Sequence, residues 1–187
     1  MSEASPLNDE ADIGRILLTA ETIEKRLDEL AETITQDYRS QAQPLTVVVI
    51  LTGALVFAAD LLRRIPLAMR IECLSASSYY SGKQTSGQVS LGQLDHLTVS
   101  GRPVLILDDI LDSGLTLHAV QSRLQERMKG AQAKICVLLR KDRPRQAQVD
   151  ADYVAFDIEN EFIVGYGLDF SGRYRNLPYI GVLKDGI

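Results

Sequence analysis

Tryptophan is absent from this 187-residue chain, and cysteine and histidine occur only twice each. With only His96 and His118, and no closely spaced pair of cysteines, the sequence offers no zinc site. Cys73 and Cys136 each lie within an apolar, strand-like run. We therefore expect both to be buried free thiols in a reducing compartment rather than partners in a disulfide.

Long hydrophobic runs and positive charge are also scarce. The longest unbroken aliphatic run, residues 47–51, is far too short to cross a bilayer. Lys and Arg total 20 against 25 Asp and Glu, a formal net charge of -5, whereas nucleic-acid and anionic-membrane binders need clustered positive charge. The first fourteen residues contain acidic but no basic side chains, the reverse of a signal peptide. We predict a cytoplasmic protein with no nucleic-acid or membrane partner.

The composition is that of an ordinary globular protein, with 45% hydrophobic and 24% charged residues. The length suits one domain, preceded by a polar, mobile arm over residues 1–14. Short β-branched runs alternate with stretches of helical periodicity, which favours an α/β fold with a mostly parallel sheet. The expected strands cover residues 45–51, 68–74, 104–107, 134–139, 153–156 and 162–166, and the expected helices cover residues 19–38, 54–64 and 115–128.

The most informative stretch, residues 104–116, reads VLILDDILDSGLT. A buried strand ends in adjacent carboxylates, Asp108 and Asp109, and a turn with a third carboxylate, Asp112, leads into a helix. The free amides and positive dipole of a helix N-terminus can hold a phosphate, and Gly114 lets the backbone approach it. Because carboxylates repel phosphate, their presence indicates a ligand that also brings a divalent cation or hydroxyl groups. A phosphorylated sugar with bound magnesium meets both demands. The alternative is that these residues only cap the helix, but capping needs one carboxylate and this stretch has three.

This stretch resembles the phosphoribosyl-pyrophosphate (PRPP) signature of type I phosphoribosyltransferases. Residues 161–169 (EFIVGYGLD) and 173–181 (RYRNLPYIG) are similar almost residue for residue to hypoxanthine-guanine phosphoribosyltransferases of bacterial type. With LLRK at 138–141 and SSY at 77–79, the resemblance covers residues 16–183. It implies the type I phosphoribosyltransferase fold, in which helices flank a central, mostly parallel sheet and a small hood covers the base site.

The implied reaction converts hypoxanthine or guanine plus PRPP to IMP or GMP plus pyrophosphate, with Mg²⁺, through an oxocarbenium-like transition state. By resemblance, Asp108 and Asp109 would bind the ribose hydroxyls directly or through Mg²⁺, and Asp169 would be a further Mg²⁺ ligand. Asp112 would face purine N7 as general base or acid. The 5′-phosphate would be held by a five-residue turn that consists of Asp112, Ser113, Gly114, Leu115 and Thr116.

For pyrophosphate, the resemblance implies main-chain amides at Thr52 and Gly53 and the side chain of Arg175. It also implies a cis peptide bond between Leu51 and Thr52. An arginine suits a polyanion because its fork is always charged and binds bidentately. This chain has Thr52 where some relatives carry Lys, Asp108 where Glu is commoner, and Ser113 where Thr is commoner. The last two exchanges keep the functional group.

On the base side, Lys141 follows the expected strand 134–139. Its ammonium group only donates hydrogen bonds, so it can pair with purine O6 and opposes the 6-amino group of adenine. Taken alone, Lys141 could also be a solvated surface lysine. The spacing from Lys141 to Phe162 resembles that of the family, and this favours the base contact. By the same resemblance Phe162 stacks on the purine and main-chain groups of Ile163 meet the ring edge. The 2-substituent would face carbonyl groups near Asp169.

Residues 75–93 are rich in serine and glycine and poor in aliphatic side chains. By themselves they suit an exposed hairpin. The resemblance, with Ser78 and Tyr79 at matching positions, implies a flexible lid over the site. Such a lid would keep water from capturing the oxocarbenium-like sugar that the departing pyrophosphate leaves behind.

Two other functions compete with this interpretation. A non-catalytic, PRPP-sensing regulator of the same fold would bind nucleic acid and need a basic face, which the net charge of -5 disfavours. An aspartyl phosphatase needs two carboxylates separated by one residue and followed by Thr or Val, unlike DDIL at 108–111. Dinucleotide-binding and P-loop motifs are absent from the sequence.

The resemblance further implies a homodimer or homotetramer that acts on a 6-oxopurine and PRPP.

Overall fold

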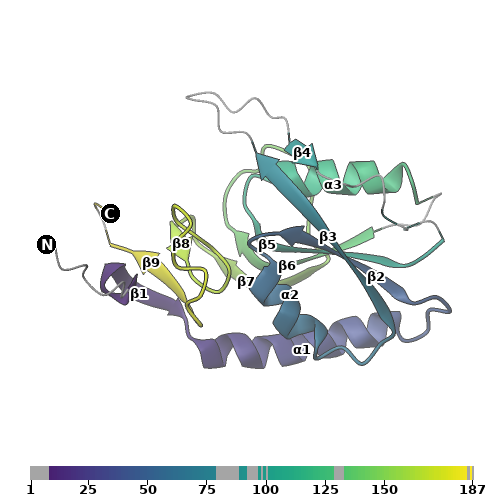
Figure 1. The fold of residues 1–187 in the computed structure, drawn as a ribbon, viewed down its shortest axis with the longest axis horizontal. Coiled ribbons are helices and arrows are strands. Elements are labelled where there is room, and N and C mark those ends of the chain that lie inside the picture. Colours follow the sequence, from purple (N-terminus) through teal and green to yellow (C-terminus); the bar gives the residue numbers. More distant parts are fainter. Residues whose placement is uncertain are drawn as a thin grey trace, which may run out of the picture.

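The computed structural model describes residues 9–78, 89–91, 97, 99, 101–128, 133–184 and 186. Its main sheet has the strand order β4-β3-β2-β5-β6-β7 (Figure 1). These strands are β2 (Leu45–Leu51), β3 (Met69–Ser78), β4 (Val89–Leu91), β5 (Val104–Leu111), β6 (Ala133–Lys141) and β7 (Tyr153–Ile158). Strands β3, β2, β5, β6 and β7 run parallel to one another, and β4 pairs antiparallel with β3 at the edge of the sheet.

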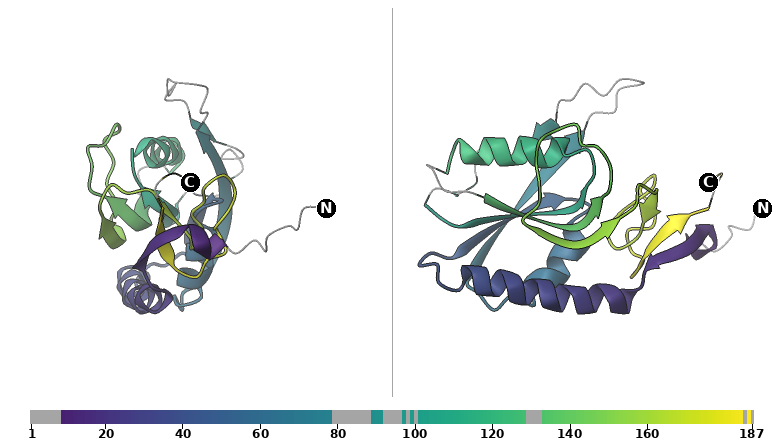
Figure 2. Two further views of the ribbon diagram at one scale, coloured as in Figure 1. Left: turned by 90° about the vertical axis from the view of Figure 1, so that its left-hand side faces the viewer. Right: turned by 180° about the vertical axis from the view of Figure 1, so that it is seen from behind.

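Helices cover both faces of this sheet, as Figure 2 shows. The described helices are α1 (Ala20–Tyr38), α2 (Leu55–Leu62) and α3 (Leu115–Gln125). Val47 and Val49 of β2 belong to the apolar cluster that includes α1 and α2, whereas Val48 and Ile50 belong to the cluster that includes α3. Both faces of the strand are therefore buried, which is why it is a continuous apolar run without alternation.

Helix α1 begins and packs as the sequence predicts. The hydroxyl of Thr19 accepts a hydrogen bond from the backbone N–H of Thr22 at 3.2 Å and caps the helix. Near this end Arg26 donates to the carbonyls of Val154 and Ala155 at 3.0 and 2.8 Å, which ties α1 to β7. The buried face consists of the residues predicted from helical spacing, namely Ile23, Leu27, Leu30, Ala31, Ile34 and Tyr38.

A second, smaller sheet joins segments from both ends of the chain, in the order β1-β9-β8. Its strands are β1 (Ile13–Leu18), β8 (Ile163–Val164) and β9 (Ile180–Leu183). All of its pairs are antiparallel, with Ile13 opposite Leu183 and Ile163 opposite Val182. It lies beyond one end of the main sheet in Figure 1 and corresponds to the hood that the resemblance implied.

Residues 9–14 differ from the mobile arm expected over residues 1–14. A 3₁₀-helix covers Asp9–Asp12, β1 follows it, and the backbone N–H of Lys184 donates to the carbonyl of Asp12 at 2.9 Å. The expectation was wrong here because backbone bonds to β9 order a segment whose side chains are mostly polar. Residues 1–8 lie outside the described part of the chain.

Strand β3 is longer than predicted, since it runs on to Ser78, which pairs with Val89 of β4. The described ends of the expected lid loop, residues 75–78 and 89–91, are therefore strand. Backbone pairing forms this hairpin without the apolar alternation that would have revealed it in the sequence. Tyr79 and the remaining residues of the expected lid lie outside the described residues.

The two cysteines differ in burial. Cys136 is buried as expected, but Cys73 is exposed, so that prediction was wrong. Cys73 shares one face of β3 with Ile71, whose exposed fraction is 53%. The packing that covers the central strands therefore does not extend over this stretch near the sheet edge.

Within the described residues, no helix is long and apolar enough to span a membrane.

Candidate active site

Strand β5 carries two carboxylates to the centre of the site. The strand continues to Leu111 instead of ending at residue 107, so Asp108 and Asp109 lie within it and the turn begins at Asp112. Asp108 is only 6% exposed, and one of its oxygens accepts the backbone N–H of Asp109 at 3.1 Å. Burial and the charge of Asp109 raise the pKa of Asp108 well above its ordinary value, and burial also raises the pKa of Asp109. The protein around these two carboxyl groups therefore disfavours their charged forms.

The turn after β5 is held by the loop that follows β6. The carbonyl of Ser113 accepts hydrogen bonds from the backbone N–H groups of Gln146 and Ala147, at 2.9 and 3.3 Å. Gly114 has a φ of +81°, and a Cβ there would lie 2.8 Å from a methyl carbon of Val149, so the position requires glycine. Helix α3 then begins at Leu115, which places Thr116 in its first turn. The predicted phosphate-binding turn thus leads directly into a helix N-terminus.

Asp112 and Lys141 come together because β5 and β6 are neighbouring parallel strands, in which Leu111 is opposite Arg140. The Lys141 Nζ lies 3.5 Å from Oδ2 of Asp112, and the lysine side chain is 11% exposed. Arg143 approaches the other side of the carboxylate, with Nη1 at 2.9 Å from Oδ1. The sequence predicted the first two residues but not Arg143, whose only signal was its position two residues after Lys141.

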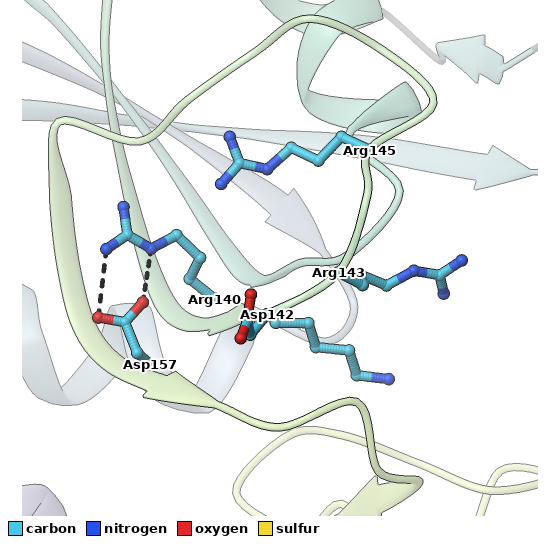
Figure 3. A pocket seen from close by; sticks show the side chains of 6 residues that line it. Arg140, Asp142, Arg143, Arg145 and Asp157 are labelled. Atoms are coloured by element: carbon cyan, nitrogen blue, oxygen red, sulfur yellow. Dashed lines mark hydrogen bonds and ion pairs between the residues drawn. The ribbon is translucent and has the colours of Figure 1, made fainter.

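The loop after β6 lines an open pocket of about 610 Å³ (Figure 3). Arg140 binds both carboxylate oxygens of Asp157, at 2.6 and 3.2 Å. Arg145 lies 3.2 Å from Asp150. Arg143 points away from the Arg140–Asp157 pair (Figure 3). Arg140 also lies 3.5 Å from Asp150, so Arg140 and Arg145 share that carboxylate, whereas Arg143 is directed to the carboxylate of Asp112.

The loop after β2 lies against the carboxylates of β5. The Leu51–Thr52 peptide is cis, as the resemblance implied. A Cβ added to Gly53 would lie 1.6 Å from a carboxylate oxygen of Asp109, so this backbone packs directly on the carboxylate. A Cβ on Gly167 would lie 2.2 Å from the carbonyl oxygen of Gly53. The segments after β2 and β8 thus meet beside β5.

Arg175 and Asp169 belong to the same group of contacts. Arg175 donates to the carbonyl of Gly167 at 2.6 Å, and its other terminal nitrogen lies 2.7 Å from a carboxylate oxygen of Asp169. The second oxygen of Asp169 accepts the backbone N–H of Gly172 at 2.8 Å. Two of the predicted pyrophosphate residues, Gly53 and Arg175, therefore both meet the backbone of Gly167, and Thr52 directly precedes Gly53.

Phe162 precedes β8 rather than lying within a strand, because β8 is only two residues long. Its ring is 56% exposed and meets the ring of Phe170 edge-to-face, with centroids 5.4 Å apart. Ile163 is buried in β8 with its backbone paired to β9. An exposed aromatic face beside a fixed backbone segment is suited to stacking on a planar ring.

Tyr166 is a positioning contact that the sequence did not reveal. Its backbone has a φ of +50°, its side chain is 5% exposed, and its hydroxyl donates to Asp60 of α2 at 2.7 Å. The bond links the loop after β8 to the helix that follows Gly53. The glycines on either side, in the sequence GYG, were the only signal of an unusual turn.

The predicted metal ligands form no ready-made cage. Among the described residues no three His, Cys, Asp or Glu side chains form a metal-binding group, so Asp169 does not join Asp108 and Asp109 in one cluster. Magnesium commonly binds through one or two carboxylates and completes its shell with water and substrate phosphates. A bound cation of that kind would offset the cost of ionising the buried carboxyl groups of Asp108 and Asp109.

Comparison with known proteins identifies the family. Residues 15–171 match the phosphoribosyl transferase domain. The chain belongs to the phosphoribosyltransferase family. This phosphoribosyltransferase is 46% identical over 177 residues to the hypoxanthine-guanine phosphoribosyltransferase of Mycobacterium avium, covering 92% of this chain and 86% of the relative. It is 42% identical over 176 residues to that of Bacillus subtilis, covering 94% and 96%.

Solved structures agree with this assignment of the fold. A crystal structure of a hypoxanthine phosphoribosyltransferase from Staphylococcus aureus superposes with a TM-score of 0.84 at 38% identity, and 97% of each chain is covered. The predicted fold class, a mostly parallel sheet with flanking helices and a small hood, is therefore confirmed.

Proposed function

We propose that this phosphoribosyltransferase is a purine-salvage enzyme that converts hypoxanthine or guanine plus PRPP to IMP or GMP plus pyrophosphate. The observation that carries the proposal is the placement of the Lys141 ammonium 3.5 Å from the Asp112 carboxylate, in the turn that leads into the N-terminus of α3. In a 6-oxopurine, O6 and N7 lie on one edge, and a donor beside a carboxylate matches that edge. The names of the relatives support the same substrates.

PRPP would bind across the carboxyl end of β5. Its 5′-phosphate accepts hydrogen bonds from the turn of residues 112–116, where the amides and dipole of α3 favour an anion. The ribose hydroxyls donate to Asp108 and Asp109, two carboxyl groups whose pKa values are raised mainly by burial. Magnesium brought with PRPP would be held by these carboxylates, with Asp169 on the pyrophosphate side, and would neutralise charge on the leaving group.

Departure of pyrophosphate breaks the bond from C1′ to its oxygen, and the electron pair leaves with the pyrophosphate. The backbone of Thr52 and Gly53 and the guanidinium of Arg175 stabilise that charge. C1′ gains oxocarbenium character and purine N9 attacks it. Asp112 takes the proton from N7 as N9 bonds, which leaves a neutral purine ring in the nucleotide.

The base would be held between three kinds of contact. Lys141 donates to O6, the exposed ring of Phe162 stacks on the purine, and the backbone of Ile163 meets the ring edge. Adenine carries a donor at position 6 and would face the ammonium group donor to donor. The lid with Ser78 and Tyr79 would exclude water while the sugar is reactive. We expect the enzyme to act in the cytoplasm as a homodimer or homotetramer.

The proposal is tested by mixing purified protein with PRPP and Mg²⁺ and with hypoxanthine or guanine. Ultraviolet spectra and mass spectrometry follow the nucleotide, and a coupled assay follows pyrophosphate. We expect IMP or GMP to form in equal amount to pyrophosphate. PRPP binding without turnover of either base would contradict the proposal and favour a non-catalytic PRPP sensor.

A further inference from the structure

Arg143 and Lys141 hold opposite oxygens of the Asp112 carboxylate. Nη1 of Arg143 donates a hydrogen bond to Oδ1 at 2.9 Å, whereas Nζ of Lys141 lies 3.5 Å from Oδ2. The stronger contact is therefore on the arginine side. If Lys141 moves to purine O6, as the proposed function requires, Arg143 is the cation that stays with the carboxylate.

The backbone of Arg143 is fixed close to the end of β6. The N–H of Arg143 donates to the carbonyl of Lys141 at 3.1 Å, and the N–H of Asp142 donates to the carbonyl of Ile158 at 2.9 Å. Pro144 follows directly and restricts the backbone of its neighbour. The guanidinium thus extends from an ordered turn rather than from a free loop.

The far side of the same loop is joined to the turn that carries Asp112. Gln146 and Ala147 donate their backbone N–H groups to the carbonyl of Ser113 at 2.9 and 3.3 Å. The ion pair of Arg143 with Asp112 therefore bridges two segments that the backbone already holds in register. A carboxylate held in this way keeps one orientation, and precise orientation of a reacting group contributes strongly to rate.

We propose that Arg143 is a positioning residue for Asp112. It binds Oδ1 so that Oδ2 faces the purine edge, and it keeps a charged partner on the carboxylate when Lys141 binds the base. The inference rests on the proposed function, because only there does Asp112 exchange a proton with purine N7. Arg143 itself touches neither substrate nor reacting atoms in this account.

The test compares Arg143→Ala, Arg143→Lys and Arg145→Ala with the wild type. Arg145 is a matched control because it belongs to the same loop and loses the same charge, but pairs with Asp150 and donates to the carbonyl of Val149. Steady-state kinetics give kcat and the KM values for hypoxanthine and PRPP, and thermal melting reports folding. We expect Arg143→Ala to lower kcat about tenfold and to change the KM for PRPP less than about twofold.

The remaining variants decide between orientation and general loop integrity. Arg143→Lys should recover most of the lost kcat, and Arg145→Ala should keep kcat within about twofold of the wild type. Wild-type kcat in Arg143→Ala, or an equal loss in Arg145→Ala, would overturn the inference while the proposed function stands. A wild type that binds PRPP but turns over no oxopurine would overturn the proposed function and this inference with it.

Discussion

The ammonium nitrogen of Lys141 lies 3.5 Å from a carboxylate oxygen of Asp112, although the two residues come from different strand ends. Parallel pairing of β5 with β6 brings these ends to the same edge of the sheet, where ligands bind in open α/β folds. In the proposed function, Lys141 supplies a donor and Asp112 an acceptor for two neighbouring atoms of one base. If the proposed function is right, the strand register determines which edge of a purine this phosphoribosyltransferase recognises.

Asp112→Asn is expected to lower kcat by about 10² to 10⁴-fold, because asparagine cannot take the N7 proton. PRPP should still bind, since the backbone amides of residues 113–116 remain. Steady-state kinetics measure the first effect and isothermal titration with PRPP and Mg²⁺ measures the second. Unchanged turnover would remove Asp112 from the mechanism, and loss of PRPP binding would show that its role is structural.

Asp108→Asn should stabilise the ligand-free protein at neutral pH. The pKa of Asp108 is raised in the folded state by burial and by the charge of Asp109, so the folded state binds this proton more tightly than the unfolded state. Stability is therefore lost as the pH rises from the ordinary aspartate value through the raised pKa. Asparagine carries no such charge, so the gain in stability of Asp108→Asn over the wild type should be largest near pH 7.5 and shrink on acidification.

Thermal melting without PRPP or Mg²⁺, between pH 4.5 and 7.5, measures this difference. Asp142→Asn is the matched control, because it removes an exposed carboxyl from a nearby loop and should leave Tm nearly unchanged. The stabilised Asp108→Asn protein should bind PRPP more weakly than the wild type. A lower Tm than the wild type at pH 7.5 would contradict the assignment of Asp108 as a costly buried charge.

Gly167→Ala should impair use of PRPP more than it impairs folding. A Cβ at this position would lie 2.2 Å from the carbonyl oxygen of Gly53, in a backbone with φ of +102°. The loop after β2 must then shift away from the proposed pyrophosphate site, and a displacement of about 1 Å can lower kcat/KM for PRPP by about 10²-fold. Gly101→Ala is the control, since its φ of +71° is also positive but no atom lies within 4 Å of the added Cβ.

Kinetics and melting of both variants separate contact from backbone strain. The strain of a positive φ is common to the two substitutions, so both should lower Tm. Only Gly167→Ala should lower kcat/KM for PRPP. Equal kinetic behaviour of the two variants would mean that the contact between Gly167 and Gly53 does not shape the pyrophosphate site.

Local signals in the sequence were sufficient for much of the fold and the carboxylate turn. The apolar spacing of α1 identified its buried face, and the run before Asp108 identified a central strand. These features are recognisable because each depends on residues close together in the chain. The resemblance to a family added the expected partners across the site, such as Lys141 and Arg175, which no local pattern could connect to Asp112.

Contacts between distant segments were less accessible. β1 and β9 pair although about 170 residues separate Ile13 from Leu183, and neither strand has a strong period-two pattern. The pair of Arg143 with Asp112 depends on the course of a loop, and loop geometry has no simple periodicity. Exposure of Cys73 depends on what covers its face of β3, which the strand's own residues do not encode.

Base selection in the wild type and in Lys141→Gln tests the central claim most directly. The measurement is kcat/KM for hypoxanthine, guanine, xanthine and adenine at saturating PRPP and Mg²⁺. We predict that the wild type uses oxopurines and discriminates against adenine by about 10³-fold or more. Lys141→Gln should lower kcat/KM for hypoxanthine by about 10- to 100-fold and so reduce the discrimination between hypoxanthine and adenine. Adenine turnover within about tenfold of hypoxanthine by the wild type would contradict the role of Lys141 beside Asp112.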